Sequence, residues 1–75
     1  MQELVKYIAQ TLVEHPESVE VIEKDGPDAI TLELRVAPED MGKVIGRQGR
    51  IAKAIRTVVK AATAKDEKPV FVEII

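Results

Sequence analysis

The stretch Val44-Ile45-Gly46-Arg47-Gln48-Gly49-Arg50-Ile51 determines the fold that we expect for this chain. Two glycines, three residues apart, enclose an arginine and a glutamine, and aliphatic residues flank them on both sides. Upstream, residues 38–43 predict a short helix. Downstream, apolar residues recur at the spacing of one helical face, namely Ile51, Ala52, Ile55, Val58, Val59 and Ala62. The glycines are therefore predicted to form a turn between two helices.

A glycine turn that enters a helix is suited to binding an anion. Glycine lacks Cβ, so it adopts backbone angles closed to other residues and lets another backbone come close. The first N–H groups of a helix have no partner within it and can point toward an anion. Lys43, Arg47 and Arg50 add positive charge. These features suit the phosphodiester backbone of a polynucleotide better than an isolated small metabolite.

Two familiar phosphate-binding loops do not fit this spacing. Gly42, Gly46 and Gly49 do not form GxGxxG, and no strand leads directly into them, so a dinucleotide-binding fingerprint is not indicated. A P-loop requires GxxxxGK followed by serine or threonine, which the chain lacks.

Residues 44–55, VIGRQGRIAKAI, resemble the core signature of a KH domain, VIGxxGxxIxxI. In this class of RNA-recognition module the GXXG loop clamps about four nucleotides of backbone. A GxxG alone occurs by chance, but here the aliphatic positions and a helix on each flank accompany it. The resemblance implies a KH domain that binds RNA.

Composition limits the class of protein. Seventy-five residues make one domain at most, and such a chain buries only a modest core. Without cysteine, neither disulfides nor thiolate metal sites are available. The sequence shows no signal-peptide pattern and no apolar run near the roughly 20 residues of a membrane span. We expect a cytoplasmic protein without a membrane partner, a metal or a cofactor.

Charge is unevenly distributed, although the formal net charge is only -2. Residues 41–64 contain six basic side chains and no acidic one, whereas residues 14–28 contain six acidic side chains and one lysine. A polyanion responds to the local patch more than to the total charge. Because the basic segment coincides with the glycine turn, we favour a functional patch over an ordinary solvated helix face.

The N-terminal half predicts a helix followed by a hairpin. Residues 3–14 form an amphipathic helix that should end near His15, because the next residue is proline. Strands are predicted at residues 18–24 and 29–36, the second from strict alternation of apolar and polar residues. The short glycine-containing turn at residues 25–28 favours antiparallel pairing. His15, the only histidine, has no ligand-spaced partner and is interpreted as structural.

The C-terminal half predicts two helices and a strand. Residues 37–40 begin the first helix with a proline and two acids, which we interpret as serving the helix end rather than catalysis. The long helix spans residues 49–64. Residues 70–75 are nearly continuous in apolar residues and predict a well-buried strand in which Phe71 packs inside. A basic stripe on the long helix consists of Arg50, Lys53, Arg56 and Lys60.

The predicted order is helix, strand, strand, helix, helix, strand. Because two helices connect the second and third strands, these strands should be parallel, with a right-handed crossover. We expect an α+β fold in which a three-stranded mixed sheet carries three helices on one face. This order resembles the type II, prokaryotic KH fold over residues 1–75, and the length is similar to that of small bacterial single-KH proteins of the KhpA family.

The resemblance implies three groups of RNA-binding residues. The clamp on the sugar–phosphate backbone consists of Gly46, Arg47, Gln48 and Gly49. Candidates for an aliphatic groove that receives bases, each with plain core as the alternative, are Val44, Ile45 and Ile51. The cations that flank the RNA path are Lys43, Arg50 and Lys53.

Only Tyr7 and Phe71 are aromatic, so an aromatic platform for bases is not expected and sequence preference should be weak. With about three phosphate contacts, the log–log dependence of affinity on salt should have a slope near -2, at about -0.7 per contact. One such site is weak alone. The resemblance implies that a homodimer, or a heteromer with a larger KhpB/Jag-like KH protein, raises the avidity.

The leading hypothesis is a single-stranded RNA-binding protein that acts broadly on transcripts, as a post-transcriptional regulator or RNA chaperone. An alternative is a protein–protein interaction module in which the GxxG turn and the long helix form a homo- or heterodimer interface. Single-stranded DNA also remains a possible ligand, since no feature of the sequence shows whether a 2′-hydroxyl is recognised. An enzyme is not expected, because no nucleophile–base set, metal cluster or cofactor loop is visible.

Overall fold

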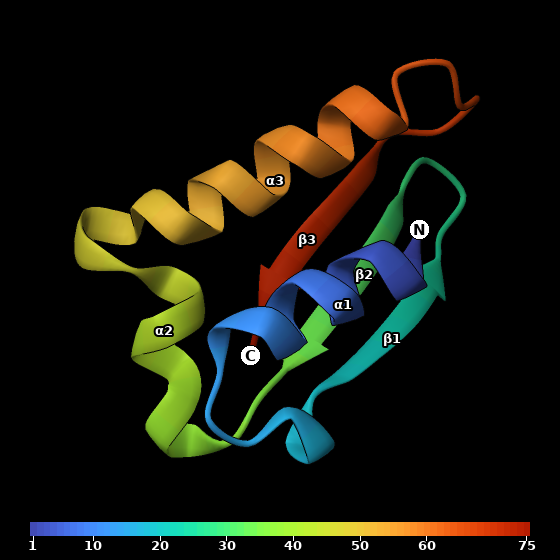
Figure 1. The fold of residues 1–75 in the computed structure, drawn as a ribbon. Coiled ribbons are helices and arrows are strands. Elements are labelled where there is room, and N and C mark those ends of the chain that lie inside the picture. Colours follow the sequence, from blue (N-terminus) through green and yellow to red (C-terminus); the bar gives the residue numbers. More distant parts are fainter.

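Three strands form one sheet in the order β1-β2-β3, and the helices lie on one face of it (Figure 1). The computed structural model describes residues 1–75. The strands are β1 (Glu20–Asp25), β2 (Ile30–Arg35) and β3 (Val70–Ile74). The α-helices are α1 (Gln2–Leu12), α2 (Met41–Ile45) and α3 (Arg50–Ala62). Three 3-10 turns occupy Pro16–Ser18, Pro38–Asp40 and Arg47–Gly49.

Strand pairing makes the sheet mixed, as the sequence predicted. β1 runs antiparallel to β2, with Glu20 opposite Arg35 at one end of the ladder. β2 runs parallel to β3, with Ile30 beside Val70. The α+β class, the element order and both pairings are therefore confirmed.

Each outer edge of the sheet receives a hydrogen bond from a helix. The side-chain amide of Gln2 in α1 donates to the carbonyl of Val21 in β1, with Nε2 and O 3.2 Å apart. On the opposite edge, Arg56 Nε in α3 donates to the carbonyl of Val72 in β3, also at 3.2 Å. Both long helices are thus fastened to a strand at the rim of the sheet.

The hydrophobic core lies between the sheet and the helices. Leu32 and Leu34 are fully buried, because β2 is the central strand and its alternate residues face the helices. The buried cluster is completed by Val5, Ala9, Val19, Val44, Ile55, Val59 and Val72. None of the helices has the combination of length and apolar composition needed to cross a lipid bilayer.

The prediction that β3 is well buried was wrong. β3 pairs only with β2, so it is an edge strand, and successive side chains point to opposite faces of the sheet. Val72 faces the core and is 4% exposed, whereas Phe71 points away from it and is 56% exposed. A run of apolar residues does not show that one face of the strand is left uncovered by helices.

The predicted apolar face of α3 was too wide. Ala52, Ile55 and Val59 are buried against the sheet, but Val58 is 45% exposed and Ala62 is also exposed. At about 100° per residue, Val58 lies to one side of the buried stripe. Because the helices form a single layer, that side stays in solvent.

The first helix ends at Leu12, two residues before the predicted end at residue 14. Val13 adopts extended angles (φ -98°, ψ 162°), so the helix stops before the proline could end it. The next two backbone N–H groups, of Glu14 and His15, donate to the carboxylate of Asp40. A contact with a residue far along the chain therefore sets this boundary.

Candidate nucleic-acid interface

The glycine turn connects α2 to α3, as predicted. Three of its four residues have positive φ: Gly46 (φ 76°, ψ 172°), Gln48 (φ 58°, ψ 24°) and Gly49 (φ 72°, ψ 16°). The turn closes on itself because the N–H of Gly49 donates to the carbonyl of Gly46 at 3.1 Å. The reversal turns the chain out of α2 and directly into α3.

The two glycines meet different physical demands. A Cβ placed on Gly46 would lie 2.6 Å from Cγ1 of Ile51 and 3.0 Å from its Cβ, so the first turn of α3 packs against a bare backbone. A Cβ on Gly49 would meet nothing within 4 Å. Gly46 is required by both its angles and its packing, whereas Gly49 is favoured only by its left-handed angles.

The turn presents polar side chains to solvent. Arg47, Gln48 and Arg50 are exposed, and one guanidinium nitrogen of Arg50 donates to Gln48 Oε1 at 3.2 Å. Arg47 has no salt-bridge partner in the structure. The predicted clamp residues therefore lie together, and the two that carry side chains, Arg47 and Gln48, are solvent-accessible.

Of the three aliphatic groove candidates, Val44 is fully buried. It belongs to the core, which was the alternative left open for it, and offers no surface beside the turn in this conformation. Ile45 and Ile51 pack against the core but keep part of their surface exposed. Only these two can offer apolar surface beside the turn.

Lys43 is paired within the protein. Its ammonium lies 2.8 Å from Glu14 Oε1 and 4.0 Å from Asp40 Oδ1. The hydrogen bond with Glu14 raises the pKa of Lys43, and the same bond lowers the pKa of Glu14. Two neighbouring carboxylates thus compensate part of the charge of Lys43, and its place among the cations that flank the RNA path stays a prediction.

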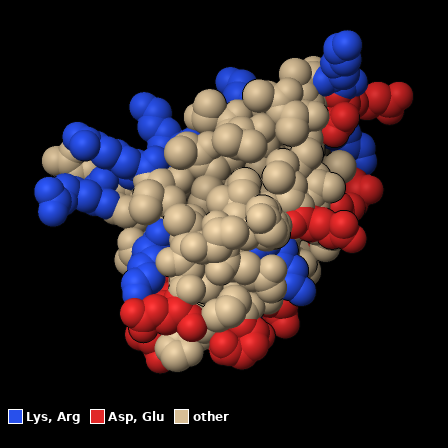
Figure 2. All heavy atoms as spheres, viewed as in Figure 1, with Lys and Arg blue, Asp and Glu red and all other residues tan.

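The other two predicted flanking cations, Arg50 and Lys53, are exposed and continue into the basic stripe along α3. Arg50, Lys53, Arg56 and Lys60 are all exposed. In Figure 2, blue side chains project at the end where α2 meets α3, while red side chains gather toward β1 and the lower end of the view. The separation of charge predicted from the sequence is thus present on the surface.

Asp40 holds the base of α2 against the segment that follows α1. Its side chain is fully buried and accepts hydrogen bonds from the N–H groups of Glu14 (3.2 Å) and His15 (3.0 Å). Burial raises the pKa of Asp40, but these two N–H donors, together with the positive charges of His15 and Lys43, outweigh it, and the net pKa lies below the ordinary value. The sequence suggested that this acid serves its own helix end; instead it caps a distant segment.

We expect Asp40→Asn to lower the thermal unfolding midpoint by about 10 °C at pH 7, because the amide cannot replace both charge-assisted bonds. The folded-state pKa is depressed, so the carboxylate stabilises the fold above its unfolded pKa and loses this effect as the pH falls below about 4. The difference in unfolding midpoint between wild type and Asp40→Asn should therefore become smaller between pH 5 and about pH 2. Glu39→Gln, at an exposed neighbour, is the control. A difference that does not change with pH would refute the stabilising role of the Asp40 carboxylate.

Comparison with known proteins gives an independent line of evidence. Residues 2–74 match the family described as KhpA/KhpB, KH domain. Over 75 residues and the full length of both chains, the sequence is 67% identical to the RNA-binding protein KhpA of Clostridium perfringens and 65% identical to that of Caldanaerobacter subterraneus. It is 43% identical to the RNA-binding protein KhpA of Aquifex aeolicus, over all of this chain and 95% of that one.

Among solved structures, the fold is similar to part of Era from Aquifex aeolicus, with a TM-score of 0.69 and 22% sequence identity. The alignment covers 97% of this chain and 28% of the Era chain. At this identity the likeness concerns the fold alone.

Proposed function

The chain belongs to the KhpA/KhpB family of KH domains, and from this premise we propose that it is a cytoplasmic protein that binds single-stranded RNA through the Gly46–Gly49 turn. The observation that carries the proposal is the turn itself, which exposes Arg47 and Gln48 on a positive-φ backbone at the basic end of an acidic protein. The relatives that match over their full length are named RNA-binding proteins. No catalytic step is part of the proposal.

The proposed mechanism is a clamp on the sugar–phosphate backbone. Because Gly49 carries no side chain and the space beside it is open, phosphates can approach the backbone of the turn closely there. Arg47 and Gln48 contact phosphate oxygens, and Arg50 and Lys53 attract the strand. Bases lie over the exposed parts of Ile45 and Ile51. This apolar surface carries no base-reading polar groups, so sequence preference is weak.

We further propose that residues 1–75 act as one KH domain and that binding is electrostatic in large part. About three phosphates are neutralised, which predicts a slope near -2 for the logarithm of affinity against the logarithm of salt concentration. Fluorescence anisotropy with a labelled unstructured RNA, titrated from about 50 to 200 mM salt, measures it. Absence of binding at low salt, or an affinity independent of salt, would refute the proposal. The same sequence as DNA tests whether the 2′-hydroxyl contributes.

Avidity comes from a partner in this proposal. A second copy of the chain, or a larger KhpB/Jag-like KH protein, brings a second weak site close to the same RNA. With low specificity, such an assembly acts on many transcripts, as a post-transcriptional regulator or RNA chaperone.

A second candidate function is a protein–protein interaction module, and a specific surface favours it. Val58 on α3 and Leu4 and Tyr7 on α1 are 45%, 37% and 67% exposed, and the two helices are in contact. Figure 2 shows a broad uncharged area in the middle of the helical side. Exposed apolar surface of this kind often marks a protein interface.

For this second candidate we expect Val58→Asp to weaken self-association at least about tenfold, because it places a charge within an apolar contact. Analytical ultracentrifugation measures the effect. Thr57→Asp, one residue away on the other flank of α3, should leave association unchanged. Equal effects of both variants, or none from Val58→Asp, would exclude this surface as the interface.

A further inference from the structure

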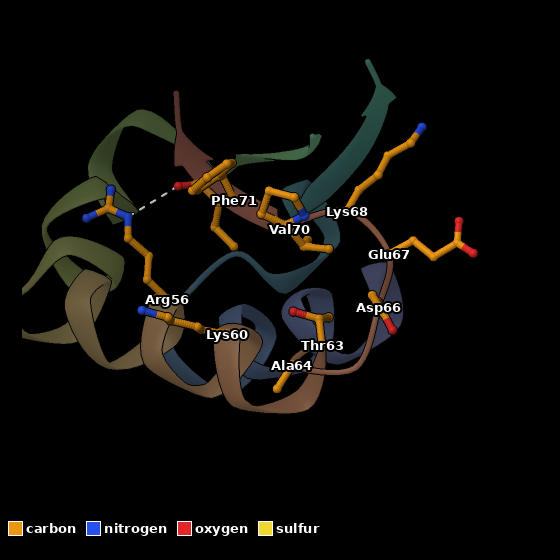
Figure 3. Close-up of a pocket in the computed structure, with 11 residues that line it drawn as sticks. Arg56, Lys60, Thr63, Ala64, Asp66, Glu67, Lys68, Val70 and Phe71 are labelled. Atoms are coloured by element: carbon orange, nitrogen blue, oxygen red, sulfur yellow. Dashed lines mark hydrogen bonds between the residues drawn. The ribbon is translucent and has the colours of Figure 1, made fainter. Parts of the chain in front are cut away.

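A cavity of about 460 Å³ lies between the C-terminal half of α3 and β3, at the edge strand of the sheet (Figure 3). Its volume is within the range of about 300–1,000 Å³ that small-molecule sites occupy. One wall is formed by Arg56 and Lys60, and the other by Val70 and Phe71. None of these residues belongs to the proposed clamp.

Phe71 gives the cavity an aromatic surface. The ring is 56% exposed, because β3 is an edge strand and this side chain points away from the core. Exposing a large aromatic ring to water is unfavourable, and its removal from water by a flat ligand is correspondingly favourable. The position therefore provides the stacking surface that the glycine turn itself lacks.

Two cations at the cavity are free to meet an anion. Arg56 uses one N–H, at Nε, to bind the carbonyl of Val72 and so holds its guanidinium at the edge of β3 with further donors unused. Lys60 is exposed and forms no salt bridge. Lys68, which also lines the cavity, is already occupied by Asp25 at 2.7 Å and the carbonyl of Gly26 at 3.0 Å.

The cavity continues the line of positive charge that begins at the turn. Arg50, Lys53, Arg56 and Lys60 lie three or four residues apart along α3. At 1.5 Å per residue, the ten residues from Arg50 to Lys60 span about 15 Å. Beyond Lys60 the acidic side chains of Asp66 and Glu67 border the cavity and end the basic line. The cavity, which both Lys60 and Phe71 line, therefore lies at the end of this line farthest from the turn.

We propose that this cavity is a second subsite for the same RNA strand, which takes one unstacked nucleobase on the ring of Phe71 and its phosphate on Lys60 and Arg56. The proposal rests on the proposed RNA binding and extends the footprint beyond the roughly four nucleotides that a GXXG loop clamps. An aromatic ring beside two unpaired cations matches a nucleotide, with its flat base and its phosphate. An acidic peptide would satisfy the cations but would leave the ring without a stacking partner.

The test compares RNA length with a substitution at the ring. Anisotropy titrations use labelled oligouridine of four and of eight nucleotides with wild type, Phe71→Leu and Phe71→Trp. Leucine keeps an apolar side chain but removes the ring, and tryptophan restores stacking. Phe71→Leu should bind the eight-mer about 5- to 10-fold more weakly, near the lower end for loss of one base–aromatic stack, and should bind the four-mer as wild type does. Phe71→Trp should bind both as wild type.

Lys60→Ala provides a second, independent arm, with Lys6→Ala on the exposed side of α1 as the matched control. Lys60→Ala should reduce the salt slope for the eight-mer by about 0.7, and Lys6→Ala should not change it. A longer strand binds more tightly simply because the protein can occupy more positions along it. Comparing each variant with wild type on the same oligonucleotide cancels this effect.

The outcomes separate this inference from the proposed function. If wild type binds neither oligonucleotide, RNA binding itself fails. A different result overturns the second subsite alone. In it, wild type binds both oligonucleotides, replacing Arg47 and Gln48 in the turn by aspartate abolishes both interactions, and Phe71→Leu binds each oligonucleotide as wild type does. The subsite is also overturned if Phe71→Leu leaves RNA affinity unchanged and instead weakens binding of an acidic peptide or self-association. Circular dichroism melting verifies that each variant is folded, which the exposure of these side chains leads us to expect.

Discussion

Replacing Arg47 and Gln48 together by aspartate is expected to lower affinity for single-stranded RNA at least about 100-fold while the fold persists. The double variant removes one cation and adds two anions in the turn, a change of three charges where phosphates approach. Two of the proposed phosphate contacts become repulsive, and counterion release at them is lost. Anisotropy at about 50 mM salt measures the loss.

The fold should tolerate this change because both side chains are exposed. Position 48 has positive φ, and aspartate is among the residues that adopt left-handed angles with least strain. The matched control is Lys6→Asp with Ser18→Asp, at two exposed positions away from the turn, which introduces the same change of charge. RNA affinity within about threefold of wild type in the turn variant would contradict the proposed clamp and favour an interaction module.

The largest loss of stability is expected from Gly46→Ala, which should lower the free energy of unfolding by about 3–5 kcal/mol. The angles of Gly46, φ 76° and ψ 172°, lie in a region used almost only by glycine. In addition, the new Cβ would lie 2.6 Å from Cγ1 of Ile51, an atom close to the backbone that cannot simply swing away. Such a loss is a large part of the roughly 5–15 kcal/mol available to a small domain.

Gly49→Ala is the matched comparison, because it has nearly the same φ but an open environment. Its Cβ would meet nothing within 4 Å, so only the left-handed angles oppose it, by about 1 kcal/mol. Urea unfolding of both variants measures the difference. Equal losses at the two positions would contradict both the packing constraint against Ile51 and the greater cost of the Gly46 angles.

Local patterns in the sequence were sufficient for most of the fold. The alternation in residues 29–36 identified the central strand, and the apolar spacing after Gly49 identified the long helix. The turn between α2 and α3 was visible because glycine spacing, flanking aliphatics and helix periodicity all occur within about 20 residues. Each of these signals depends on neighbours in the chain.

The errors concern contacts between residues far apart. Asp40 binds N–H groups 25 and 26 residues away, and no local pattern announces that contact. The pairing of Lys43 with Glu14, on a segment brought near by the fold, was not predicted from the sequence either. Phe71 was placed in the core because its strand is apolar, but it lies on the sheet face opposite the helices, whereas Val72 lies on the covered face. Tertiary packing, rather than residue type, decided all three.

The hydrogen bonds that the helices make at both rims of the sheet bear on how molecules of this protein behave when crowded. An open strand edge invites the strand of a neighbouring molecule to extend the sheet, which is how ordered aggregates grow. Here the amide of Gln2 and the guanidinium of Arg56 each occupy an outward-facing carbonyl, of Val21 and Val72, that an incoming strand would need. When two molecules meet, these hydrogen bonds therefore hinder the addition of a strand from one molecule to the sheet of the other.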